Sequence, residues 1–235
     1  MYHALWADWY LPAALPALEA LFFSRIDPGS AVIDVCCGSG HVTKELIQRG
    51  YHVTGIDSSF ALIALARRDL PGVDFRVQEV QQLRVEKQFD AALSTFDSLN
   101  HLLTLEGLRG ALRSVRRVLK PGGLFLFDMN LEEAYCADSR RWSATVEEDS
   151  VGLVRGTYDP GTKMASTELI WFKRADNEEL WERRCSIVQQ RCYTQMEITV
   201  GLADAGFSRI EAVSGRQAGM SSELALGRMF FSATA

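Results

Sequence analysis

The sequence predicts an α/β fold: a doubly wound, mostly parallel seven-stranded sheet with helices on both faces, plus an inserted antiparallel β meander that forms a cap. Three observations lead to this prediction. Apolar runs alternate with helical patterns between residues 31 and 128, and a glycine-containing turn follows the first run. Beyond residue 128, β-type alternation and turn sequences replace the helical patterns. Alternating strands and helices are typical of a parallel sheet that is covered on both faces.

The first segment of the chain, residues 1–30, is expected to be helical. Leu15, Leu18 and Phe22 recur at the spacing of an amphipathic helix. The segment lacks a basic start and contains Glu19, so it does not read as a signal peptide. No stretch of the chain is long enough and free enough of charge to predict a membrane span.

The strands of the parallel sheet are expected at the apolar runs, with helices between most of them. The strands are 31–35, 51–56, 73–77, 90–94 and 124–128, and the helices are 41–49, 60–69 and 105–119. Ligands of such sheets bind beyond the carboxyl ends of the strands.

The cap is expected from four strands that follow the fifth core strand, at 144–148, 152–158, 164–172 and 180–190. Turn residues separate them at Asp159-Pro160-Gly161-Thr162 and at 175–178. Such a meander suits a cover for a substrate, and a structural extension or a dimer interface is the alternative.

The end of the chain is expected to return to the core. A helix over 194–205 would begin at Thr194 as its N-cap and end at Gly206. Strands 207–213 and 228–234 would then form an antiparallel pair.

One domain of 235 residues accommodates all of these segments. We divide it into an N-terminal helical segment (1–30), a cofactor-binding core (31–130), an antiparallel cap insertion (140–193) and a return to the core sheet (194–235). No internal repeat or linker demands a second domain.

Composition limits the partners and the compartment. The formal net charge is −5, so no global basic field attracts nucleic acid. The five cysteines show no C-x-x-C metal spacing, and we expect reduced thiols in a cytoplasmic protein without a metal site.

The most informative stretch runs from Val32 to His41 and is followed by Gly55-Ile56-Asp57. An apolar strand enters a glycine-containing turn, a helix starts, and a second strand ends in a carboxylate. This order is typical of a nucleoside site. A tight turn with an unrelated acid downstream is the alternative. A nicotinamide site is disfavoured because the G-x-G-x-x-G triplet is missing.

The letters Asp34-Val35-Cys36-Cys37-Gly38-Ser39-Gly40 resemble the glycine-rich motif D-x-G-x-G-x-G of class I S-adenosylmethionine-dependent methyltransferases. Cys36 stands at the first glycine of that pattern. The resemblance implies that Asp34 orients the loop or the methionine amino group and that Gly38 and Gly40 let the main chain pass under the ligand. It also implies that Asp57 binds the ribose hydroxyls, with Ser39 and Ser58 beside the cofactor.

The resemblance continues in order along the chain. Residues 74–80 resemble the third conserved strand, which implies that Glu79 bonds the adenine amino group and that the Val80 N–H meets a ring nitrogen. Residues 89–101 resemble the fourth strand and the loop that faces the methyl group, with Thr95 and Phe96 at the cofactor. The turn into the family's fifth strand is resembled by Leu119 to Gly123. The turn into its sixth strand is resembled by Ala205-Gly206-Phe207.

The loop after the fourth expected strand carries the catalytic candidates. Histidine is ordinarily near its titration range at neutral pH, so His101 is the best candidate for a base. Asp97 could orient an amine or bond it directly. The alternatives are that Asp97 and Ser98 cap the turn and that His101 packs at a helix start. Near the N-terminus, Tyr10 and Tyr2 are candidates for contact with the methionine carboxylate or the substrate.

These observations predict a small-molecule methyltransferase with S-adenosylmethionine as cofactor and S-adenosylhomocysteine as product. We favour N-methylation of an amine, such as an amino sugar or an amino-acid-like metabolite. O-methylation is the runner-up, and a non-catalytic protein that binds S-adenosylmethionine or another nucleoside is the alternative outside this class. The expected partner is the small-molecule acceptor, without nucleic acid or membrane, in a possible homodimer.

Overall fold

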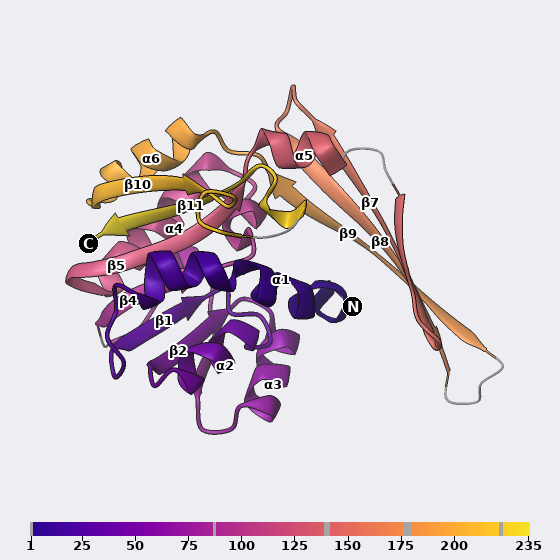
Figure 1. Cartoon of the computed structure of the whole chain (residues 1–235), viewed down its shortest axis with the longest axis horizontal. Coiled ribbons are helices and arrows are strands. Elements are labelled where there is room, and N and C mark those ends of the chain that lie inside the picture. Colours follow the sequence, from indigo (N-terminus) through magenta and orange to yellow (C-terminus); the bar gives the residue numbers. More distant parts are fainter. Residues whose placement is uncertain (1, 87, 139–141, 176–179, 221–222) are drawn as a thin grey trace.

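The computed structural model describes residues 2–86, 88–138, 142–175, 180–220 and 223–235, without the side chains of residues 2–9 and 138. The described residues form a seven-stranded sheet and a four-stranded sheet. Figure 1 shows the first sheet inside a layered core and the long strands of the second leaving that core as an arm.

The core sheet has the strand order β10-β11-β5-β4-β1-β2-β3. Only β11 runs antiparallel to its neighbours β10 and β5, and the other described pairs are parallel. The predicted mostly parallel, seven-stranded sheet is therefore confirmed. Its strands are β1 (Ala31–Val35), β2 (His52–Asp57), β3 (Asp74–Val77), β4 (Phe89–Ser94), β5 (Leu119–Asn130), β10 (Ser208–Ser214) and β11 (Arg228–Thr234).

Helices cover both faces of this sheet because apolar side chains alternate along its strands. Val32 of β1 packs with α1 and α2, whereas Ile33 and Val35 pack on the other face with α4 and α6. The α3 helix packs on Phe75 of β3. The helices are α1 (Tyr2–Leu18), continued by a π-helical turn (Glu19–Phe23), α2 (His41–Gln48), α3 (Phe60–Asp69), α4 (Leu105–Val118) and α6 (Gln195–Asp204).

The second sheet follows a short helix, α5 (Glu132–Asp138), and pairs its strands antiparallel in chain order. The predicted meander is thereby confirmed. Its strands are β6 (Trp142–Val146), β7 (Ser150–Asp159), β8 (Met164–Arg174) and β9 (Trp181–Arg191). The first predicted turn is present, because Asp159 accepts the Gly161 N–H at 3.0 Å and the Thr162 hydroxyl at 2.8 Å. Residues 176–178 of the second predicted turn lie outside the described residues.

Two boundaries differ from the sequence prediction. The fifth strand begins at Leu119, not at Leu124, and the helix before it ends at Val118. The predicted turn at 119–123 is drawn into the sheet, because the Gly122 N–H donates to Ala235 O at 2.7 Å and the Ala235 N–H to Gly123 O at 2.8 Å. Pairing with the end of the chain, which is remote in sequence, decides this boundary.

The last helix begins as predicted. Thr194 accepts the Glu197 N–H at 3.1 Å, and the Glu197 carboxylate accepts the Thr194 N–H at 2.8 Å. This reciprocal capping fixes where α6 starts after the cap returns to the core.

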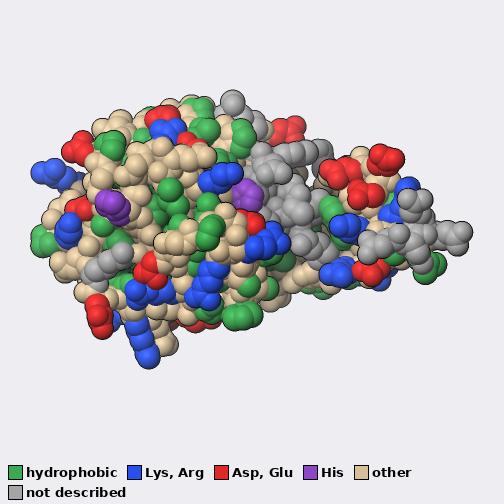
Figure 2. All heavy atoms as spheres, turned by 90° about the horizontal axis from the view of Figure 1, so that it is seen from below, with side chains coloured by type: hydrophobic (Ala, Val, Ile, Leu, Met, Phe, Trp, Pro, Cys, Tyr) green, Lys and Arg blue, Asp and Glu red, His purple; other side chains and the backbone are tan. Residues whose placement is uncertain are grey.

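Charged side chains of both signs are interspersed over the face drawn in Figure 2. Across the described part of the chain, no helix combines the length and the apolar character that crossing a membrane requires.

Candidate active site

A cavity of about 560 Å³ lies beyond the carboxyl ends of β1, β2, β3 and β4. Its volume lies in the usual range for small-molecule sites. Each of the four strands ends in a short segment that lines it. The predicted cofactor residues that line it are Tyr10, Cys36, Gly38, Ser39, Asp57, Ser58, Glu79, Val80, Thr95 and Phe96.

The turn after β1 brings backbone close to this cavity. Gly38 has a φ of 57°, and a Cβ built there would meet no atom within 4 Å, so the space beside it is open. Gly40 has a φ of 89°, which L residues rarely adopt, and a Cβ there would lie 3.1 Å from the Leu70 side chain, so this position favours glycine. Cys36 has a φ of 60°, in the left-handed region where the resembled motif has glycine.

Asp57 holds the turn in place from the end of β2. One carboxylate oxygen accepts the Gly38 N–H at 2.9 Å, and the other accepts the Ser59 N–H at 2.8 Å. Each carboxylate oxygen can accept a further bond, and the side chain lines the cavity. The geometry therefore leaves Asp57 able to bind ligand hydroxyls as well as to order the loop.

Asp34 and Gly40 do not belong to the described lining of this cavity. Asp34 is buried, with 1% of its surface exposed, and it accepts the Thr43 hydroxyl at 2.5 Å. Burial raises the pKa of Asp34 to about 7. The structure thus places this carboxyl beneath the loop, where it joins β1 to α2.

Tyr10 of α1 covers one side of the cavity. Its ring stacks on Phe96 with centroids 4.5 Å apart, and its hydroxyl donates to Asp128 at 3.1 Å. Burial raises the pKa of Tyr10, which keeps the phenol protonated. The side chain of Tyr2, the other candidate, lies outside the described residues.

A second cavity of about 380 Å³ lies between the core and the cap. Phe96, His101 and Val188 line both cavities, so the two spaces meet at these side chains. Polar side chains make up much of the second lining. They include Asn130, Ser143, Thr157, Ser166, Thr167 and Gln190.

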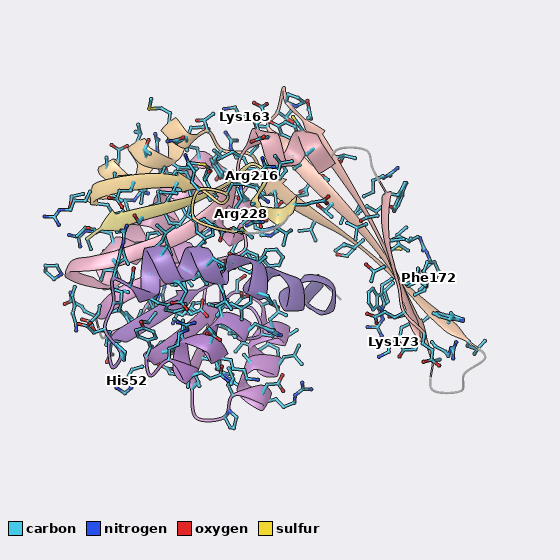
Figure 3. The ribbon with its side chains drawn as sticks, viewed as in Figure 1. His52, Lys163, Phe172, Lys173, Arg216 and Arg228 are labelled. Atoms are coloured by element: carbon cyan, nitrogen blue, oxygen red, sulfur yellow. The ribbon has the colours of Figure 1, made fainter. Side chains whose placement is uncertain are left out.

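A buried ion-pair network forms the floor of the second cavity. Arg228 of β11 donates to Asp97 at 2.8 Å and also to Asp128 at the end of β5. Burial raises the pKa of Asp128, and the Arg228 charge opposes that effect. Figure 3 shows Arg228 where the core sheet meets the root of the arm. Sequence reasoning missed Arg228, and no local signal points to it, because its partners Asp128 and Asp97 lie 100 and 131 residues away in the chain.

The candidate Asp97 therefore lines the second cavity while it also pairs with Arg228. Its side chain makes no capping bond to the 3-10 turn that follows (Ser98–His101). The Ser98 hydroxyl holds that turn instead, donating to Thr95 O at 2.7 Å. His101 is the last residue of the turn rather than the start of a helix.

Asn100 ties the same turn to both sheets. Its amide nitrogen donates to Asn130 O at 3.1 Å and to Arg191 O at 2.8 Å, and its oxygen accepts the Asn130 N–H at 3.0 Å. The loop that carries Asp97 and His101 is thus bonded to β5 of the core and to β9 of the cap.

Comparison with known proteins agrees with this architecture. A family model described as "Methyltransferase domain" matches residues 32–123, the region that supplies most of the first cavity. Residues 32–123 therefore form a methyltransferase domain of the class I, S-adenosylmethionine-dependent type. The predicted family, fold class and cofactor are therefore confirmed.

Individual relatives of this methyltransferase cover different shares of it. A Bacillus subtilis (strain 168) protein is 32% identical over 136 residues, 55% of this chain, and the chain spans about half (51%) of that relative. A ubiquinone biosynthesis O-methyltransferase of Xanthomonas oryzae pv. oryzae (strain PXO99A) is 32% identical over 164 residues, 65% of each chain. The S-adenosylmethionine-bound structure of CalS10, an amino pentose methyltransferase from Micromonospora echinaspora, is 25% identical, with a TM-score of 0.75 over 96% of this chain and 91% of the other.

The residues around the first cavity fit the cofactor of this family. The open space beside Gly38 admits a ligand against backbone, and Asp57 and Glu79 offer acceptors for hydroxyl and amino groups. Ile56, Leu62 and Val80 supply apolar surface for a flat base. The roles of the individual residues remain predictions.

Proposed function

We propose that this methyltransferase transfers a methyl group to the nitrogen of a small-molecule amine, with an amino sugar as the favoured acceptor class. The observation that carries the proposal is the meeting of the two cavities at Phe96, His101 and Val188. When bound, S-adenosylmethionine supplies the methyl group from a sulfonium sulfur. An acceptor in the second cavity would approach that methyl beside His101.

The protein's own contribution is to hold the acceptor, to exclude water and to accept one proton from the amine. Fixing two reactants in an aligned geometry can lower a barrier by about 7–11 kcal/mol. Tyr10 of α1 lines the first cavity and Val188 of the cap strand β9 lines both, so these side chains would limit the access of water to a bound acceptor. His101 would take the proton that an amine must lose before its lone pair can attack.

The lining of the second cavity supports an amine on a hydroxylated scaffold. Asp97 and Asp128 share the single guanidinium of Arg228, so the floor carries more negative than positive charge when both acids are ionised. That charge favours a basic acceptor. The hydroxyl and amide side chains above the floor suit the hydroxyls of a sugar. Similarity to CalS10, an amino pentose methyltransferase, supports the same class of acceptor.

O-methylation is the second candidate, and similarity to the ubiquinone biosynthesis O-methyltransferase supports it. A hydroxyl acceptor requires a stronger base than an amine does. An imidazole at the junction therefore suits nitrogen better than oxygen.

A matched pair of acceptors tests the proposal. The protein is incubated with methyl-labelled S-adenosylmethionine and either 3-amino-3-deoxyglucose or glucose, and then with amino acids and nucleotide-linked amino sugars. Mass spectrometry locates the label. Label on nitrogen is the expected result. Label on oxygen alone would replace the proposal with O-methylation, and cofactor binding without transfer to any acceptor would contradict it.

His101→Ala should lower kcat roughly 10²–10⁴-fold, the usual contribution of a positioned base, and leave S-adenosylhomocysteine affinity within about threefold (RT ln 3 ≈ 0.6 kcal/mol). The control is His52→Ala, because His52 is exposed and lies at the far side of the core in Figure 3. Equal turnover in both variants would remove His101 from catalysis.

The organisation of the whole protein belongs to the same proposal. We propose a single domain with the segments 1–30, 31–130, 140–193 and 194–235. Within these segments, residues 1, 87, 140, 141, 176–179, 221 and 222 lie outside the described part. A homodimer, a cytoplasmic location and the absence of nucleic-acid and metal partners stay predictions.

A further inference from the structure

Gln190 lies where the cap strand β9 meets the loop that carries Asp97 and His101. It is 8% exposed and lines the second cavity. Its side-chain nitrogen is 2.5 Å from a carboxylate oxygen of Asp97 and 3.4 Å from Nε2 of His101. One amide nitrogen therefore faces both residues that the sequence singled out as catalytic candidates.

The hydrogen-bonding capacity of these groups fixes the arrangement. A glutamine amide nitrogen has two N–H donors and no acceptor. The Gln190 amide can donate to both neighbours if Asp97 accepts one N–H and His101 Nε2 accepts the other. The proton of a neutral His101 then resides on Nδ1, which faces the backbone oxygen of Gln189 at 3.1 Å. Two consecutive residues of β9 thus favour the same tautomer.

We propose that Gln190 is a positioning residue for methyl transfer, acting through His101 and Asp97. It holds His101 as the neutral Nδ1–H tautomer, so that the Nε2 lone pair faces the acceptor cavity. The N–H of an incoming acceptor takes the place of the Gln190 amide at Nε2. This inference rests on the proposed function, because it assigns the group that prepares the base for that reaction.

Other charged or titratable groups surround this pair and are common to every variant compared below. Asp97 precedes His101 on the same loop, Arg228 and Asp128 come from β11 and β5, and Tyr10 comes from α1. Glu223, from a 3-10 turn (Glu223–Ala225), lines the same cavity. Since none of them is altered, a difference between the variants reports on position 190.

Gln189 provides a matched control on the same strand. Its side chain is exposed, and it reaches His101 through its backbone carbonyl. Gln189→Glu therefore adds the same charge one residue away and keeps the carbonyl bond. Gln190→Glu replaces the shared donor by a carboxylate that faces His101 directly.

The test follows the His101 imidazole nitrogens by NMR in the full chain with S-adenosylhomocysteine bound, with His101→Ala used to identify their signals. We expect the Nδ1–H tautomer in the wild type. In Gln190→Glu the pH midpoint of the His101 signals should rise by about one unit or more, as beside a new carboxylate. The acidic limb of kcat/KM should move with it. Gln189→Glu should move both by less than about 0.3 units, the smaller effect of an exposed charge.

Equal shifts in the two variants, or an Nε2–H tautomer in the wild type, would overturn the inference. If Gln190→Glu does not fold, Gln190→Met keeps the volume and removes both donors. It should give a mixture of tautomers and a lower kcat while S-adenosylhomocysteine binding is retained, and an unchanged tautomer would overturn the inference. The NMR result needs no turnover. Absence of N-methylation with the expected tautomers would therefore refute the proposed function alone.

Discussion

The two cavities are built in different ways. The first is formed by short segments that follow neighbouring parallel strands, and its main tie joins Asp57 to Gly38, 19 residues apart. The second is formed by side chains of the cap and the core, and its ties join Asp97 to Gln190 and Arg228, 93 and 131 residues away. Local backbone geometry defines the first cavity, whereas long-range side-chain pairing defines the second, the proposed acceptor site.

The core sheet and the cap sheet also differ in how far their strands are buried. Four of the five residues of β1 are buried, whereas most of β9 is exposed until Gln190 near its end. Figure 3 shows Phe172 and Lys173 far out on the arm, away from the core. The cap is therefore positioned mainly by contacts at its root, and these contacts should be the most sensitive to change.

The largest effect is expected at the ion-pair network of that root. Arg228→Met leaves two buried carboxylates without their cation and should lower the free energy of unfolding by about 3–5 kcal/mol. Urea denaturation measures this change. Adding Asp97→Asn should recover part of the loss, because it removes one uncompensated charge.

Arg25→Met is the control for this substitution. Arg25 pairs with Glu211 at 3.1 Å, but both side chains are about half exposed. Its loss should cost less than about 1 kcal/mol. If Arg25→Met and Arg228→Met lowered the free energy of unfolding by similar amounts, the ion pairs at the root of the cap would matter no more than an ordinary surface pair.

The next effect concerns pH and the floor of the cofactor loop. The pKa of Asp34 is raised by burial to about 7, above its usual value near 4. As pH rises, Asp34 loses its proton at a lower pH in the unfolded chain than in the folded chain. The contribution of protonated Asp34 to the free energy of unfolding is therefore complete below pH 4 and is lost as pH rises to about 7. The loss should reach roughly 4 kcal/mol.

Comparing the pH dependence of unfolding in the wild type and Asp34→Asn isolates this contribution, since asparagine carries no such proton. Asp90→Asn provides a control of opposite sign, because Lys120 lowers the pKa of Asp90 and that stabilisation is lost as pH falls. Parallel curves for the wild type and Asp34→Asn between pH 4 and 7 would contradict a protonated Asp34.

A smaller effect is expected for cofactor affinity. Asp57→Ala removes a charged acceptor that orders Gly38 and Ser59. S-adenosylhomocysteine affinity should fall about 10–100-fold, which corresponds to about 1.4–2.7 kcal/mol. Calorimetric titration measures it. Asp69→Ala, at the exposed end of α3, should leave the affinity unchanged, and an equal loss there would refute the role of Asp57.

The smallest effect tests the strain in the glycine-rich turn. Cys36→Gly relieves a left-handed backbone at a residue with a side chain and should stabilise the fold by up to about 1 kcal/mol. Cys37→Gly has no such strain to relieve and removes a side chain that packs with Phe75, so it should destabilise. Thermal unfolding of both variants compares them directly, and equal destabilisation would show that Cys36 is not strained.

The sequence was sufficient for the fold and for most of the cofactor cavity. Strand β1 was predicted at its observed bounds, because an apolar run that ends in a glycine-containing turn is a local signal. The strands of the cap were found within a few residues, since their turns carry Asp, Pro and Gly. The start of β5 was wrong because its pairing partner, Ala235, lies at the other end of the chain.

The second cavity could not be derived in the same way. Gln190 looks like any polar residue of an exposed strand until β9 is placed against the loop of Asp97. Arg228 acquires its role only when β11 lies beside β5, which brings it to Asp128. Such contacts depend on tertiary packing, and no local pattern encodes them.

A crystal structure with S-adenosylhomocysteine and the best amine acceptor would decide whether the two cavities work as one active site. We expect the thioether product in the cavity beside Gly38 and Asp57. The acceptor nitrogen should lie in the second cavity, next to His101 Nε2 and facing the sulfur between Phe96 and Val188. An acceptor bound elsewhere, or one whose nitrogen is turned away from the sulfur, would contradict this arrangement.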